Sequence, residues 1–133
     1  MWRKALAVVL AASLGGTCSL ALPEPPKCSG NPKLVGACFT VHGRMREGNG
    51  GPPIRIWPIG TDRMLGLWEP TDDTSVAWLP ESLYRKMDED HQIFADFLVC
   101  PLTKQTEDKL QIVCVESAAR IVRTIIPPSK REW

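Results

Sequence analysis

Arginine, tryptophan and histidine side chains gather in one stretch of the sequence, between residues 42 and 78. Flat tryptophan rings can stack on sugar rings or hold a peptide, and arginine adds charge and hydrogen-bond donors. The alternative is that the tryptophans cover the core of a small domain, where large aromatic rings often lie. The candidate ligand-binding residues are His42, Arg44, Arg55, Trp57, Arg63, Trp68 and Trp78.

His42 is the member of this set that could transfer a proton near neutral pH. It falls on the polar face of a predicted strand beside Thr40 and Arg44, so it is a general base, a ligand contact or a solvated side chain. The other histidine, His91, follows an acidic run, where capping or exposure to solvent accounts for it. No serine or cysteine lies in a motif that would activate it as a nucleophile. The sequence therefore predicts no catalytic residues and favours a protein that is not an enzyme.

Neither a metal nor a cofactor is predicted. The acidic runs at residues 72–73 and 88–90 could hold calcium through carboxylate oxygens, but neither has the glycine-bearing ligand loop of an EF-hand. We interpret them as solvated loop charge. No two cysteines have the close spacing of a zinc knuckle, and there is no glycine-rich phosphate loop.

Residues 1–21 have the three-part pattern of a secretory signal peptide. A basic start at residues 2–4 precedes an apolar run at 5–14, and Ser19 and Ala21 supply the small residues of a cleavage site. The apolar run is too short to span a bilayer, which needs roughly 20 residues. No later segment is long and apolar enough to span a bilayer, so no membrane span is predicted.

A lipid anchor on Cys18 is the alternative to cleavage after Ala21. Gly15 and Thr17 fit the lipoprotein pattern poorly, so we expect an exported protein that is periplasmic or secreted. Cleavage after Ala21 changes the formal net charge from +1 to −1. A nearly neutral chain has no electrostatic footprint for nucleic acid or for an anionic membrane.

Hydrophobic periodicity predicts a mainly β domain. Residues 38–45 alternate between an apolar and a polar face, which is typical of a half-buried strand. Pro80 suits the first position of a short helix. The predicted elements are strands at 38–45, 54–59 and 63–69, a helix at 80–87, and strands at 92–102, 110–116 and 120–126, of which the last is either a continuation or a sixth strand.

These elements predict a single β domain at residues 35–126, after an extended leader at 22–34 and before a tail at 127–133. Three strands, a helix and two more strands are the element order of the OB-fold, a small five-stranded barrel. An open meander with a packed helix is the alternative. The prediction is a five- to six-stranded OB-like barrel or meander with one short helix between strands three and four.

Either treatment of the signal leaves four cysteines, an even number that suits disulfide bonds in an oxidising compartment. Cys100 and Cys114 flank the connection between two neighbouring predicted strands, where opposite side chains come within disulfide range. Cys28 would then tie the leader to Cys38 at the start of the first strand. The predicted pairs are Cys28–Cys38 and Cys100–Cys114.

Several segments resemble a pattern found in a family of small, uncharacterised exported bacterial proteins. The similar segments are residues 39–45, the Asn49-Gly50 turn, and residues 55–61, 63–66, 95–102 and 113–118. The resemblance covers most of the chain after the signal peptide. It implies a bacterial origin and export, and it carries no activity.

The sequence thus predicts an exported envelope protein that acts as a non-catalytic binding or interaction module. Its partner would be another protein or an envelope glycan. One alternative is a hydrolase of envelope polymers that uses His42 with a carboxylate the sequence does not identify. Another is a structural or stress-protective envelope protein without a discrete site.

Overall fold

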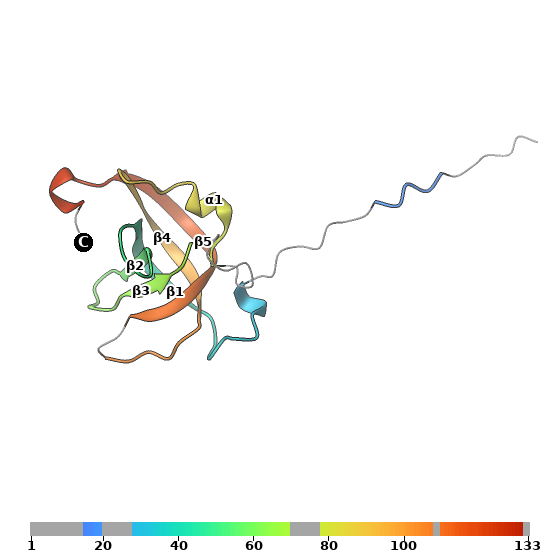
Figure 1. Ribbon diagram of the computed structural model, residues 1–133, viewed down its shortest axis with the longest axis horizontal. Coiled ribbons are helices and arrows are strands. Elements are labelled where there is room, and N and C mark those ends of the chain that lie inside the picture. Colours follow the sequence, from blue (N-terminus) through green and yellow to red (C-terminus); the bar gives the residue numbers. More distant parts are fainter. Residues whose placement is uncertain (1–14, 20–27, 70–77, 108–109, 132–133) are drawn as a thin grey trace, which may run out of the picture.

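A computed structural model describes residues 15–19, 28–69, 78–107 and 110–131. These residues are mainly β, with one short α-helix (Figure 1). The predicted cleavage point after Ala21 lies outside the described residues. In chain order the elements are η1 (Cys28–Gly30), β1 (Phe39–Glu47), β2 (Ile54–Pro58), β3 (Leu65–Leu67), α1 (Glu81–Tyr84), β4 (His91–Pro101), β5 (Gln111–Ile125) and η2 (Pro128–Lys130).

The five strands form one mixed sheet that closes into a ring in the order β1-β2-β3-β5-β4. β1, β2 and β3 are the antiparallel meander that the alternation predicts. β4 runs antiparallel to both β1 and β5, and β3 meets the start of β5 in a short parallel pairing. β5 is continuous, so the segment predicted at 120–126 continues the strand before it.

The helix α1 follows β3 and precedes β4 in the chain, and it is shorter than the predicted helix at 80–87. Leu79, Leu83 and Met87 recur every four residues, a spacing that places side chains on one face of a helix, and all three are buried in the core. No helix within the described ranges is long and apolar enough to cross a membrane.

Alternation along each strand separates the core from the outer face of the ring. In β2, Ile54 and Ile56 are fully buried, whereas Arg55 and Trp57 between and after them are only half-buried. β4 behaves in the same way, and its Phe97 is the largest fully buried side chain of the core. Burial of one such side chain stabilises a fold by roughly 1.5–3 kcal/mol.

β1 changes partner along its length, and Gly43 lies where the two pairings overlap. Gly43 is opposite Pro58 of β2 and also opposite Ala95 of β4. A Cβ atom at residue 43 would lie 2.8 Å from Ile56 Cγ2 and 3.0 Å from the Trp57 carbonyl oxygen. Glycine therefore lets β2 approach closely at the point where β1 passes between its two neighbours.

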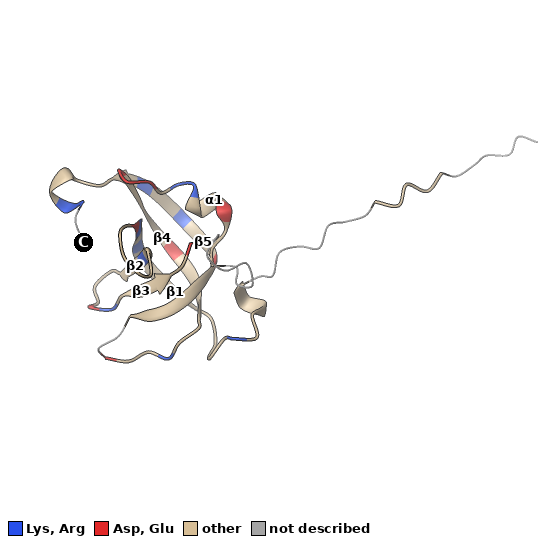
Figure 2. Cartoon of the chain, in the orientation of Figure 1, with Lys and Arg blue, Asp and Glu red and all other residues tan. Residues whose placement is uncertain are grey.

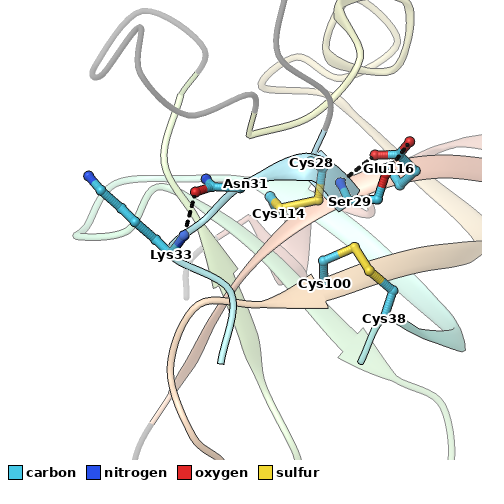
Figure 3. The surroundings of a disulfide bond; sticks show 8 residues. All are labelled: Cys28, Ser29, Asn31, Lys33, Cys38, Cys100, Cys114 and Glu116. Carbon is cyan, nitrogen blue, oxygen red and sulfur yellow. Dashed lines mark hydrogen bonds between the residues drawn. A yellow bond between two sulfur atoms is a disulfide. The ribbon is translucent and has the colours of Figure 1, made fainter. Parts of the chain in front are cut away.

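The predicted disulfide pairs Cys28–Cys38 and Cys100–Cys114 are wrong. Cys28 bonds to Cys114, and Cys38 bonds to Cys100 (Figure 3). The predicted register is correct, because Cys100 and Cys114 are opposite one another on β4 and β5. Each of the two sulfur atoms is nevertheless bonded to a cysteine from another part of the chain.

The predicted pairs are wrong because the segments that carry Cys28 and Cys38 lie beside different strands. Phe39 is opposite Val99, so Cys38 is carried to the next position along β4, where Cys100 lies. The turn η1 docks on β5 instead of β1, because the Ser29 backbone N–H and hydroxyl both donate to the Glu116 carboxylate, at 2.8 and 3.1 Å. Cys28 is thereby held beside Cys114.

We expect each disulfide to stabilise the fold by about 4 kcal/mol, because the two bonds restrict the unfolded chain across loops of 62 and 86 residues. The paired variants Cys28→Ser/Cys114→Ser and Cys38→Ser/Cys100→Ser should each show that loss in urea unfolding. Peptide mapping without reduction should recover the Cys28–Cys114 and Cys38–Cys100 bonds. Recovery of a Cys28–Cys38 peptide from correctly folded protein would contradict the structure.

Candidate ligand-binding face

The outer face of β1 and β2 brings together four of the seven candidate residues: His42, Arg44, Arg55 and Trp57. Arg44 is opposite Trp57 in the β1–β2 register, and its guanidinium carbon lies over the indole ring, 4.7 Å from the ring centroid. On the other side of β1, Arg44 is opposite Phe94. Arg44 therefore lies between two paired strands, and both members of the stacked pair are half-buried.

A pocket of about 430 Å³ opens beside this stacked pair. Within it, the Arg55 side chain is held in place by a hydrogen bond from its Nε to the Pro52 carbonyl oxygen, at 3.3 Å. The turn η2 forms the far wall of the pocket. The lining residues are Arg44, Arg46, Arg55, Trp57, Met64, Ser129 and Lys130.

Arg46 attaches the C-terminal turn to β1. Its side chain is buried, and its guanidinium donates hydrogen bonds to the backbone carbonyls of Lys130 and Arg131. Removal from water lowers the pKa of Arg46, and the nearby positive charge of Arg44 lowers it further. Ile126, just before the turn, is buried, and its N–H donates to the Asp90 carbonyl oxygen at 2.7 Å.

His42 belongs to a second polar group on the same outer face. It lies two residues before Arg44 on β1. Its Nδ1 lies 2.7 Å from Asp96 Oδ1, and the Arg120 Nε lies 2.5 Å from Asp96 Oδ2. The Arg120 hydrogen bond is the main cause of a lowered pKa at Asp96, and the His42 hydrogen bond is the next. A carboxylate only accepts hydrogen bonds, so Nδ1 carries the proton and Nε2 is left for another partner.

Arg120 reaches Asp96 from an irregular part of β5. The register with β4 shifts between Phe94 and Asp96, and Arg120 has a left-handed φ of 51° at that point. Bulges of this kind redirect side chains, and a left-handed conformation is costly for a residue that has a Cβ. The bulge turns the guanidinium of Arg120 onto Asp96.

The remaining three candidates lie elsewhere in the molecule. Arg63 stacks over the Phe39 ring at 5.7 Å and donates to Gln111, near the start of β5. Trp68 is 38% exposed and follows β3. Trp78 is buried in the main core, which leaves little of its ring for a ligand.

Sequence reasoning identified His42, Arg44, Arg55 and Trp57 but missed Arg46, Asp96 and Lys130. Asp96 and Lys130 come from segments far along the chain, and only the sheet register and the position of η2 bring them to this face. The alternation that places Arg44 on the outer face of β1 also places Arg46 there, so that signal was present in the sequence.

A cluster of cysteine sulfur atoms lies apart from this face. The sulfur atoms of Cys28, Cys100 and Cys114 all lie within 4.8 Å of one another. All three are in disulfide bonds, so none offers a thiolate to a metal.

Comparison with protein-family models, with curated protein sequences and with solved structures finds no match to this chain. The resemblance to exported bacterial proteins therefore stays a prediction, and the geometry of the face is what indicates a function.

We expect Arg120→Gly to raise the pKa of Asp96 towards the ordinary aspartate value of about 3.9 without disturbing the backbone, because glycine accepts the left-handed φ. Carbon-13 NMR titration of the carboxyl groups measures this directly. Asp88 is the internal control, because its pKa is lowered by His91 and should not change.

Because folding lowers the pKa of Asp96, chiefly through its hydrogen bond with Arg120, this contact stabilises the fold fully above about pH 4 and is lost as the pH falls through the folded pKa. The urea concentration at the unfolding midpoint should therefore fall less for Arg120→Gly than for the wild type when the pH is lowered from about 5 to about 2. Equal falls in the two proteins would contradict the assignment.

Proposed function

We propose that this protein is an exported, non-catalytic binding module of OB-like architecture that takes its ligand on the outer face of β1 and β2. The observation that carries the proposal is the Arg44–Trp57 stacked pair, which faces a solvent-accessible pocket. Aromatic rings and arginine side chains are the groups most enriched where proteins bind with high affinity.

The strand order supports the OB-like assignment. A five-stranded ring in the order β1-β2-β3-β5-β4, with β3 parallel to β5 and a helix between β3 and β4 in the chain, is the arrangement expected of that fold. The usual ligand face of an OB-fold lies around its second and third strands and the loops beside them. The pocket fits that position, because Arg55 and Trp57 of β2 and Met64 just before β3 line it.

The two disulfides support export. Disulfides form and persist in oxidising compartments such as the periplasm or the extracellular space. The basic start, the apolar run and the small residues before residue 22 are the pattern of a signal peptide. An envelope glycan or an envelope protein is therefore the partner that the location provides.

We expect Trp57→Ala to weaken binding of peptidoglycan fragments or of a purified envelope partner by about tenfold or more, because it removes a central aromatic contact. Isothermal calorimetry measures the affinity. Trp68→Ala is the matched control, since it removes a partly exposed tryptophan that does not line the pocket. Wild-type protein that binds neither ligand, or equal losses in the two variants, would contradict the proposal.

A hydrolase is the second candidate, and the His42–Asp96 pair is the observation that favours it. A carboxylate on Nδ1 holds an imidazole in the tautomer whose Nε2 can take a proton, as in hydrolytic triads. The imidazole is exposed, because 55% of the His42 side chain is accessible to solvent. Asp96 supplies the carboxylate that this alternative requires.

We expect the wild-type protein to bind peptidoglycan fragments without cleaving them. His42→Ala should change binding little, because His42 shares the outer face but does not line the pocket. Mass spectrometry of the fragments after long incubation checks for products. Cleavage that falls by about a hundredfold or more in both His42→Ala and Asp96→Asn would establish the hydrolase instead, because general-base catalysis contributes on that scale.

A further inference from the structure

The lining of the pocket has one sign of charge. Four of its seven residues are cationic and none is acidic: Arg44, Arg46, Arg55 and Lys130. The neighbouring pocket is different, because Glu47, Glu89 and Asp90 line it together with Arg46 and Arg131. Figure 2 shows the basic residues of this region on β1, β2 and the C-terminal turn.

Arg44 has no carboxylate partner among the described residues. Its Nε is buried without a hydrogen-bond partner there, although its guanidinium stacks on Trp57. Three other arginines do form ion pairs with carboxylates: Arg120 with Asp96, Arg123 with Asp88 and Arg131 with Asp90. Arg44 also lines the pocket, so an anion bound there would meet a cation that no carboxylate of the described residues neutralises.

Arg44 and Arg46 are two residues apart on β1, and both line the pocket. The charge of Arg44 lowers the pKa of the buried Arg46, which means that the two groups repel one another in the folded protein. The fold keeps them together because Arg46 donates to the η2 carbonyls and Arg44 packs on an indole ring. An anion bound in the pocket that both residues line would relieve this repulsion.

The other residues that line the pocket indicate what kind of molecule bears the anionic group. A volume of about 430 Å³ is in the range of small-molecule sites, and the Trp57 ring and the Met64 thioether offer apolar contact to a sugar ring. The Ser129 hydroxyl adds a donor and an acceptor. A long polyanion fits less well, because Glu89 and Asp90 line the adjoining pocket.

We infer that this pocket binds an acidic sugar unit of a glycan, with its carboxylate or phosphate group held by Arg44, Arg55 and Lys130 and its ring against Trp57. Arginine suits either anion, because its planar fork can donate two parallel hydrogen bonds. The inference depends on the proposed binding function and specifies the chemistry of its ligand.

NMR titration of the full-length protein tests the inference with four probes. These are hyaluronan tetrasaccharide for a carboxylate, N-acetylglucosamine 6-phosphate for a phosphate, chitotetraose as the neutral glycan and tetraglutamate as an acidic peptide. We expect the acidic sugars to bind about tenfold or more tightly than chitotetraose, since charged hydrogen bonds contribute on that scale. Whichever acidic sugar binds more tightly identifies the anion. Added salt should weaken the acidic sugars selectively.

Arg44→Gln should reduce the affinity for the acidic sugars about tenfold, while the affinity for chitotetraose changes little. Arg63→Gln is the matched control, because Arg63 also stacks on an aromatic ring but lies outside the pocket. Lys130→Gln is a second variant on the exposed C-terminal turn, where a substitution leaves the core intact. It should weaken the same probes.

The outcomes separate this inference from the proposed function. Equal binding of chitotetraose and the acidic sugars, with Trp57 signals shifting in both, would overturn the anion site but leave the binding face. Preference for tetraglutamate over every sugar would overturn the glycan assignment. Equal effects of Arg44→Gln and Arg63→Gln would overturn the assignment of Arg44. Binding of none of the probes, together with no effect of Trp57→Ala on any envelope ligand, would remove both proposals.

Discussion

The register of β4 against its two neighbours is the constraint on which the rest of the structure depends. Asp96 is opposite His42 on one side and Ala119 on the other, and Cys100 is opposite Cys114 four residues further along. A slip of one residue would exchange the two faces of a strand, moving core side chains such as Phe97 to the outside. The disulfides, the His42–Asp96 pair and the core therefore all require the same alignment.

The binding face depends on a second constraint, the change of partner along β1. Because the pairings with β2 and β4 overlap near Gly43, Arg44 has a strand on each side and stacks on Trp57. The C-terminal turn is then attached over the same region by Arg46. Several positive charges are thus held close together by backbone carbonyls and an aromatic ring. A fold that holds like charges in place before a ligand arrives spends little free energy on ordering them during binding.

Local patterns predicted much of this fold because they depend on neighbouring residues alone. Apolar and β-branched runs located the five strands, and alternation predicted the outward position of Arg44. Leu79, Leu83 and Met87 marked the buried side of the segment around α1. Such patterns could not predict which distant segments meet. The partner of His42 is 54 residues away along the chain, and Lys130 enters the pocket from beyond the last strand. The disulfide prediction failed for the same reason, because it assumed that the leader packs on the strand that follows it.

The nested disulfides affect how the protein is made. The Cys38–Cys100 bond spans 62 residues and lies inside the Cys28–Cys114 bond, which spans 86. On the proposed export route, a chain that crosses a membrane N-terminus first delivers Cys28 and Cys38 to the oxidising side well before the other two cysteines arrive. An oxidant acting at that moment joins two cysteines that are 10 residues apart and are not bonded to each other in the finished fold. That bond must then be exchanged through attack by a later thiolate. On that route, correct pairing requires a compartment that can exchange disulfides as well as form them.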